Sequence, residues 1–190
     1  SYPINWLIIS ATLDLLGYDA ETILQQTQQF DIPSHRLEHV ATINDTLYYN
    51  DSKSTIMQAT LASVNSLIKK HNQKPLILIL GGTSKGVDRA GYIKQLSNTT
   101  THIICFGTEA ETLKRTCDDC QISSESYTTL EEAVLATQKI NSPSCVLFSP
   151  GGASFDLFKN YEERGACFKK IVATLQENNS LTAMRCKLYD

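Results

Sequence analysis

Short apolar runs alternate with longer amphipathic segments along the chain from residue 37 onward. A continuous apolar run bounded by turn residues is typical of a buried strand, whereas apolar residues at every third or fourth position indicate a helix. Their alternation predicts an α/β fold with a mostly parallel sheet and helices on both faces. The predicted strands are residues 37–43, 46–49, 75–80, 102–106, 125–128 and 145–148, and the predicted helices are residues 55–70, 90–96, 109–115, 130–139 and 156–175.

The first two predicted strands are separated only by Asn44 and Asp45, a pair suited to a tight hairpin turn, so they should be antiparallel. Before them, residues 4–16 and 19–29 have the pattern of two amphipathic helices, and Pro33 prevents further helix. We therefore expect a helical segment with a linker in residues 1–34 and one domain in residues 35–176. Residues 177–190 are predicted to form a frayed C-terminal tail.

Composition narrows the functional classes. The formal net charge of -3 and the pI near 5.8 argue against a nucleic-acid binder. No apolar run is long enough for a membrane span, and the first residues lack a signal peptide, so we expect a cytoplasmic protein without a membrane partner. The chain starts with Ser1 rather than Met, as expected of a piece of a longer protein.

The six cysteines fit a reducing cytosol. Cys105 and Cys145 lie in apolar strand-like runs, where a small buried thiol is usual. Cys117 and Cys120 form a C-x-x-C pair, but no second pair or suitably spaced His accompanies it for zinc. We expect a surface turn with reduced thiols there, and no metal site.

Three predicted strands end in segments whose chemistry suits an anion. Residues 49–55 read Tyr-Asn-Asp-Ser-Lys-Ser-Thr, residues 81–88 read Gly-Gly-Thr-Ser-Lys-Gly-Val-Asp, and residues 149–154 read Ser-Pro-Gly-Gly-Ala-Ser. In an open parallel sheet, ligands bind beyond the carboxyl ends of the strands. Turn amides at a helix start, together with lysine charges, favour a negatively charged ligand.

Each segment also has a plain structural interpretation. The first segment resembles an ordinary cluster of helix-capping residues, and the second a solvated loop without a Walker A or dinucleotide motif. Tyr161, two helical turns beyond Ser154, also suits core packing. A nucleophilic serine is disfavoured because the G-x-S-x-G pattern does not match. Three such segments together nevertheless predict one anionic ligand.

These segments carry a resemblance to a known family. The residues concerned are Asn50 to Thr55, Gly81-Gly82-x-x-Lys85, and Ser149-Pro150-x-x-Ala153-Ser154-x-Asp156-x-Phe158 with Tyr161 and Arg164-Gly165; His35-Arg36 resembles the family's entry into the domain. Residues 5–172 thereby resemble the C-terminal domain of the Mur ligases that add D-glutamate to UDP-N-acetylmuramoyl-L-alanine (MurD type). The resemblance implies a Rossmann-like Mur ligase C-terminal domain after a short helical remnant of the central ATP-binding domain.

The resemblance implies an ATP-dependent amide ligase of peptidoglycan synthesis, monomeric, with ATP and Mg²⁺ as cofactors. ATP phosphorylates the carboxylate of UDP-N-acetylmuramoyl-L-alanine, and the amine of D-glutamate attacks the acyl phosphate. The family's UDP-binding domain and most of its central domain, with the Mg²⁺ ligands and a modified catalytic lysine, are missing from this sequence. We therefore expect no catalytic residue here and no ligation by this chain alone.

Site residues follow from the same resemblance. The residues implied for ATP are Asn5 (adenine side), Arg36 (phosphates) and Asp51 (ribose). Those implied for D-glutamate are Thr55, Lys85, Ser154, Phe155 and Tyr161. Lys53 is given a supporting electrostatic role. Gly151-Gly152 and Tyr161 depart from the family pattern, in which Ala follows the Ser-Pro pair and Phe is common at the tyrosine's position.

Two alternatives stay open. The first is the C-terminal domain of a related Mur ligase or folylpolyglutamate-type ligase, which adds a different amino acid. The second is a binding module for nucleotides or anions without catalysis. A redox enzyme is disfavoured because no dinucleotide fingerprint is present.

Overall fold

The computed structural model describes residues 3–27, 33–71, 74–140 and 143–186. The chain divides into two compact units, Ser1–Pro33 and Ser34–Asp190. In the first unit, α1 (Pro3–Leu15) and α2 (Ala20–Thr27) correspond to the two predicted helices. Gly17 ends α1 with a φ of 87°, and Asp19 caps α2 by accepting a hydrogen bond from the Thr22 N–H (2.9 Å).

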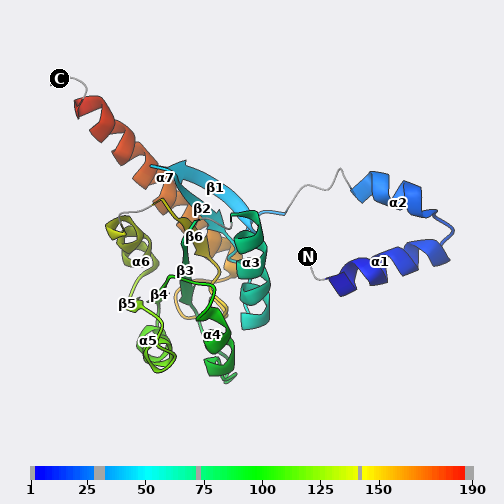
Figure 1. Ribbon diagram of the computed structural model, residues 1–190, viewed down its shortest axis with the longest axis horizontal. Coiled ribbons are helices and arrows are strands. Elements are labelled where there is room, and N and C mark those ends of the chain that lie inside the picture. The colour runs from blue at the N-terminus through cyan, green and yellow to red at the C-terminus, as the bar shows by residue number, and fades with distance from the viewer. Residues whose placement is uncertain (1–2, 28–32, 72–73, 141–142, 187–190) are drawn as a thin grey trace. The chain divides into compact units, whose positions relative to one another are not determined.

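Six strands form a single sheet in the described part of the second unit (Figure 1). The strand order is β1-β2-β6-β3-β4-β5, where β1 is Glu38–Ile43, β2 Thr46–Asn50, β3 Leu76–Gly81, β4 His102–Phe106, β5 Ser124–Tyr127 and β6 Cys145–Phe148. Only β1 and β2 are antiparallel among these neighbours. Asn44 and Asp45, with φ values of 47° and 62°, make the turn between them. The predicted mostly parallel sheet with an antiparallel hairpin is confirmed.

Helices cover both faces of this sheet. The helices α3 (Met57–Lys70), α4 (Ala90–Leu96) and α5 (Ala110–Asp119) pack on one face, and α6 (Leu130–Ala136), the 3₁₀ helix η1 (Thr137–Lys139) and α7 (Tyr161–Cys186) belong to the other. The apolar run of β3 serves both faces, because Leu78 and Leu80 join the first core cluster while Ile77 and Ile79 join the second. Strand side chains alternate between faces, so an unbroken apolar run is what a doubly covered strand needs.

The last helix differs from its prediction at both ends. It begins at Tyr161 rather than near residue 156, and it continues to Cys186 through residues predicted as a tail. Asn160 accepts a hydrogen bond from the Glu163 N–H (2.7 Å), and Glu163 accepts one from the Lys159 N–H (2.7 Å). These reciprocal bonds resemble a capping box and place the helix start after Asn160. Ser154 therefore lies outside the helix.

The predicted surface turn is wrong for Cys117, whereas Cys120 lies half-buried in the turn that follows α5. Cys117 lies inside α5, is fully buried, and interacts with the thiol of Cys105 on β4 in the same core cluster. This contact raises the pKa of the Cys105 thiol, and burial adds to the increase. Cys105 and Cys145 are buried, as predicted, and the cysteines described by their side chains are free thiols.

Candidate functional site

Three loops meet at the carboxyl ends of β2, β3 and β6. We call residues 51–56 the first loop, residues 82–89 the second and residues 149–160 the third. The third loop binds the other two, since the Gly151 N–H donates to Ser54 O (2.9 Å), and Thr83 and Ala153 exchange backbone hydrogen bonds of 2.8 and 2.9 Å. Because β6 lies between β2 and β3 in the sheet, its loop is placed to join them.

Glycines allow the second and third loops to meet backbone to backbone. A Cβ atom on Gly152 would lie 2.5 Å from Gly81 O, and one on Gly82 would lie 2.2 Å from Ala153 O. Gly82 also has a φ of 67°, which side chains disfavour. Glycine at positions 82 and 152 is therefore required by this close approach.

The expectation that the turn amides are available to an anion is wrong for two of them. The amides of Gly151 and Ala153 donate to backbone carbonyls of the first and second loops. The helix dipole expected behind Ser154 is also absent at that point, because α7 begins only at Tyr161. The amides of Gly151 and Ala153 are therefore not available to a ligand.

Asp51 ties the first and third loops together from inside. Its side chain is 2% exposed, and its Oδ2 accepts hydrogen bonds from Ser54 Oγ (2.5 Å) and Ser149 Oγ (2.8 Å). Its Oδ1 accepts a hydrogen bond from the Leu37 N–H (3.2 Å). Burial raises the pKa of Asp51, and the hydroxyl hydrogen bonds oppose that increase. The carboxylate thus organises the loops, and its ribose contact stays a prediction.

Arg164 is a second internal tie. It is fully buried on α7, where Nε donates to Ser52 Oγ (3.0 Å), Nη2 to Ser52 O (2.8 Å) and Nη1 to Gly152 O (3.0 Å). Burial lowers its pKa to about 10, against a smaller opposing effect of Asp156. The guanidinium therefore stays charged at neutral pH and fastens the first loop to the third.

Two lysines of the site each lie over an aromatic ring. Lys53 Nζ is 5.5 Å from the ring centroid of Tyr161, and Lys85 Nζ is 5.8 Å from that of Phe155. We call these the Lys53 corner and the Lys85 corner. An ammonium group over a ring keeps its charge while its position is restricted. Each corner therefore offers one positioned positive charge.

The structure brings most of the predicted site residues to this edge. The loops carry Asp51, Lys53, Thr55, Lys85, Ser154 and Phe155, and α7 starts with Tyr161. Arg36 lies exposed just before β1. The neighbouring Glu162 raises the pKa of Tyr161, and the charge of Arg36 opposes that increase. Asn5 belongs to α1 in the other unit, and its side chain lies outside the described residues.

Sequence reasoning gave no role to four residues that hold the loops. They are Arg89, Glu109, Ser149 and Arg164. One signal was available for Arg164, which occupies the same helix stripe as the buried Phe168, Val172 and Leu175. A charged residue on a buried stripe needs internal partners. The other three have no comparable sequence signal.

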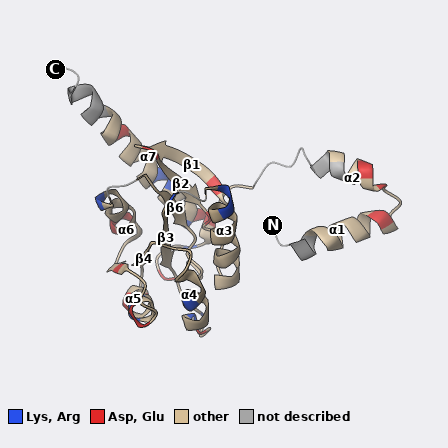
Figure 2. Cartoon of the chain, viewed as in Figure 1, with Lys and Arg blue, Asp and Glu red and all other residues tan. Residues whose placement is uncertain are grey.

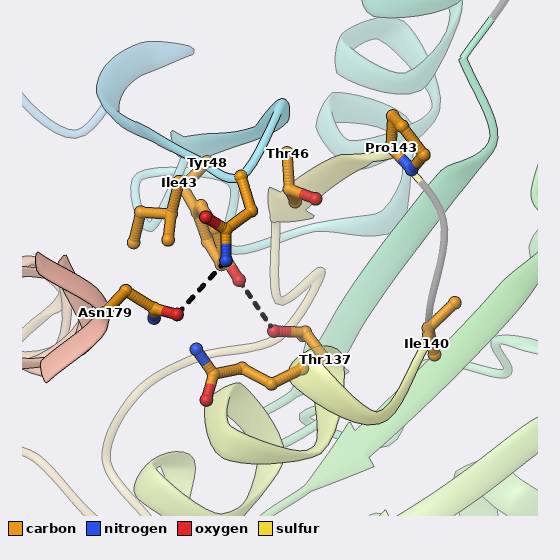
Figure 3. A pocket seen from close by; sticks show the side chains of 9 residues that line it. Ile43, Thr46, Tyr48, Thr137, Ile140, Pro143 and Asn179 are labelled. Atoms are coloured by element: carbon orange, nitrogen blue, oxygen red, sulfur yellow. Dashed lines mark hydrogen bonds between the residues drawn. The ribbon is translucent and has the colours of Figure 1, made fainter. Parts of the chain in front are cut away.

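A separate cavity of about 450 Å³ lies where β2 and β6 begin, at the opposite end of these strands (Figure 3). Its lining is uncharged, and its polar groups largely pair with one another, as in Tyr48 with Thr137 (3.1 Å) and Asn44 with Asn179 (3.1 Å). The described Lys and Arg residues lie on several separate elements (Figure 2). Charges suited to an anion therefore favour the three-loop edge over this cavity.

The chain is similar in sequence to ligases that add D-glutamate, as their names state. UDP-N-acetylmuramoylalanine--D-glutamate ligase of Francisella tularensis subsp. holarctica (strain FTNF002-00 / FTA) is 36% identical to the chain, with 92% of the chain and 41% of that protein covered. The ligase of the same name from subsp. novicida (strain U112) gives the same values. The chain thus spans less than half the length of these relatives.

No helix in the described ranges has the length and apolarity of a membrane span.

Solved structures share the fold at low identity. The UDP-N-acetylmuramate-alanine ligase MurC of Thermotoga maritima matches with a TM-score of 0.61 and 13% identity over 86% of this chain and 36% of that chain. MurF from Acinetobacter baumannii matches with a TM-score of 0.58 and 15% identity over 82% of this chain and 35% of that chain.

The family model for the Mur ligase, glutamate ligase domain, matches residues 35–152, more than half of the chain. The chain belongs to the Mur ligase family.

Proposed function

We propose that the chain is the C-terminal part of an ATP-dependent amide ligase that adds D-glutamate to UDP-N-acetylmuramoyl-L-alanine in peptidoglycan synthesis. ATP, when bound, activates the carboxylate of that substrate as an acyl phosphate. The amine of D-glutamate then attacks the acyl carbon and phosphate leaves. The 36% identity to ligases of this name supports D-glutamate over the amino acids of more distant Mur and folylpolyglutamate ligases.

One observation carries the assignment of the amino-acid site to this chain. Two positioned ammonium groups, Lys53 and Lys85, lie on loops that are hydrogen-bonded together through the third loop. D-glutamate has two carboxylates, so a site with two positive corners matches its charge. In this proposal Lys85, with Ser154, Thr55, Phe155 and Tyr161, binds D-glutamate, and Lys53 supplies supporting charge.

The nucleotide assignments are proposed on the same basis. Arg36 is exposed and free to extend toward ATP phosphates. Asn5 is proposed for the adenine side, and Asp51 for the ribose. Asp51 is the least direct of these, since it is buried and both its oxygens accept hydrogen bonds from within the protein. The described residues contain no group of three potential metal ligands.

The test is a set of substitutions in the full-length ligase that carries this chain. Lys85→Ala should raise the KM for D-glutamate by about tenfold or more, because a charge-assisted contact to a carboxylate is lost. Ser154→Ala should raise it less, and the KM for ATP should stay unchanged in both. The control is Lys94→Ala, an exposed lysine on α4. An unchanged KM for D-glutamate in Lys85→Ala would contradict the assignment.

A further inference from the structure

Lys85 lies in a turn whose backbone is unusual for lysine. The Val87 N–H donates to Ser84 O (3.1 Å), and the two residues between, Lys85 and Gly86, have φ values of 53° and 79°. Positive φ at both central positions is typical of type I′ turns, which favour Asn and Gly. A lysine there adopts an unfavourable conformation, which the surrounding structure must impose.

Glu109 holds the residue that precedes Lys85. Its Oε1 accepts hydrogen bonds from the Ser84 N–H (2.9 Å) and Ser84 Oγ (3.3 Å). Ser84 Oγ in turn accepts a hydrogen bond from the Gly86 N–H (3.3 Å). A single carboxylate oxygen therefore fixes both the start and the interior of the turn. Glu109 itself comes from the segment between β4 and α5, outside the three loops.

Arg89 holds the other side of the same carboxylate and the base of the second loop. Its Nη2 donates to Glu109 Oε2 (2.8 Å) and to Gly82 O (2.7 Å), and its Nη1 donates to Gly81 O (3.3 Å). Arg89 is 6% exposed, so its position is set by these partners rather than by water. The ion pair thus connects the strand end, the loop and the turn that carries Lys85.

We propose that Arg89 and Glu109 are positioning residues that hold Lys85 in place for the carboxylate of the amino-acid substrate. The inference rests on the proposed function, because it requires that Lys85 binds D-glutamate. In the described structure both residues contact the loop rather than the ring and ammonium group of the Lys85 corner. Their loss should therefore weaken amino-acid binding while leaving ATP binding and turnover intact.

The experiment compares Glu109→Gln with Glu111→Gln in the full-length ligase. Glu111 is an exposed glutamate in the first turn of α5 and serves as a matched control. Glu109→Gln should raise the KM for D-glutamate by about tenfold, the effect of losing one charge-assisted hydrogen bond, with kcat and the KM for ATP unchanged. Glu111→Gln should leave all three unchanged. A lower kcat, with the KM values for D-glutamate and ATP changed to the same extent, would indicate a merely structural role and overturn the proposal.

A double-mutant cycle separates this inference from the function on which it rests. In a Lys85→Ala background, Glu109→Gln should add nothing to the KM for D-glutamate, because the group it positions is gone. Additive effects on the KM for D-glutamate would overturn the positioning role but not the proposed function. A raised KM in Lys85→Ala with an unchanged KM in Glu109→Gln would do the same. No effect of Lys85→Ala would overturn both proposals.

A second variant keeps the test valid if Glu109→Gln folds poorly, and a measurement on the turn itself complements the kinetics. Arg89→Lys keeps the charge but cannot reach two carbonyls and Glu109 together, so it should give the same selective rise in the KM for D-glutamate. Amide hydrogen exchange on the chain should show faster exchange at Ser84 in Glu109→Gln with an unchanged melting temperature. Unchanged exchange at Ser84 would contradict the positioning role.

Discussion

The Lys53 corner and the Lys85 corner present the same pair of chemical groups, yet the protein holds them by different means. The first loop, which carries Lys53, is fastened by Arg164, which is fully buried and bonded only to neutral groups of Ser52 and Gly152. The second loop, which carries Lys85, is fastened by an ion pair whose carboxylate, Glu109, is 31% exposed. One corner is therefore continuous with the core, and the other is held near the surface.

This difference has a consequence for how each corner responds to change. A buried guanidinium without a carboxylate partner cannot be weakened by salt, and its removal leaves carbonyl oxygens without donors. A partly exposed ion pair is screened by salt, and its groups can be solvated when it breaks. We expect the Lys53 corner to be lost only when the whole domain unfolds, whereas the Lys85 corner can be disturbed locally.

The largest effect should come from removing the two arginines in turn. Arg164→Met leaves Ser52 O and Gly152 O buried without donors, so it should lower the free energy of unfolding by about 3 kcal/mol. Arg89→Met also leaves Gly81 O and Gly82 O without that donor, but the Glu109 carboxylate it frees can be solvated, so its cost should be smaller. High salt should reduce only this second loss. Urea unfolding of the chain at two salt concentrations measures both.

The control for this pair is Arg115→Met, on the exposed surface of α5, which should change stability by no more than about 0.5 kcal/mol. Equal losses for Arg164→Met and Arg89→Met, with the same salt dependence, would mean that the two corners are held alike. The different partners of Arg164 and Arg89 would then make no difference to the stability of the two corners.

A second, smaller effect concerns pH and the first loop. Burial raises the pKa of Asp51 above its ordinary value, so folding favours the neutral carboxyl. The resulting stabilisation is fully present below the unfolded pKa of about 3.9 and is lost as pH rises through the raised pKa. The stability of the wild type relative to Asp51→Asn should therefore fall as pH rises from about 4 to 7.

Thermal unfolding across this pH range provides the measurement. Asp119→Asn, at an exposed position at the end of α5, is the matched control, and we expect a smaller change for it. A difference between wild type and Asp51→Asn that rises with pH would mean that the hydrogen bonds from Ser54 and Ser149 outweigh burial. Asp51 would then favour folding as an anion.

Much of the fold could be predicted because the signals are local. The runs that form β3, β4 and β6 are apolar over nearly their whole length. Asn44 and Asp45 alone specify the turn between β1 and β2. The start of α7 was missed because Asp156 to Phe158 fit a helical pattern equally well. Its true start depends on the bonds of Asn160 and Glu163, which compete with that pattern.

The site was predicted less completely because its ties join distant parts of the sequence. Lys85 and Ser154 were proposed as site residues from the chemistry of their own loops, and their roles stay predictions. Arg164, by contrast, has partners on Ser52, which is 112 residues away, and Glu109 supports a turn 25 residues before it. No pattern within a short window reports such contacts, since they exist only once the sheet has ordered its strands.

The smallest effect should come from the hydroxyl of Tyr161. The ring of Tyr161 lies under Lys53, while its hydroxyl interacts with the exposed Glu162, so only the ring should matter for the corner. Tyr161→Phe should therefore leave the KM for D-glutamate unchanged and shift the melting temperature by at most about 2 °C. Tyr161→Leu should raise that KM, because Lys53 loses the ring that restricts it.

Phe155→Leu makes the same change at the Lys85 corner, where the turn still holds the lysine, and should raise the KM for D-glutamate less than Tyr161→Leu does. A larger effect of Phe155→Leu would show that its ring, rather than the ion pair behind the turn, positions Lys85.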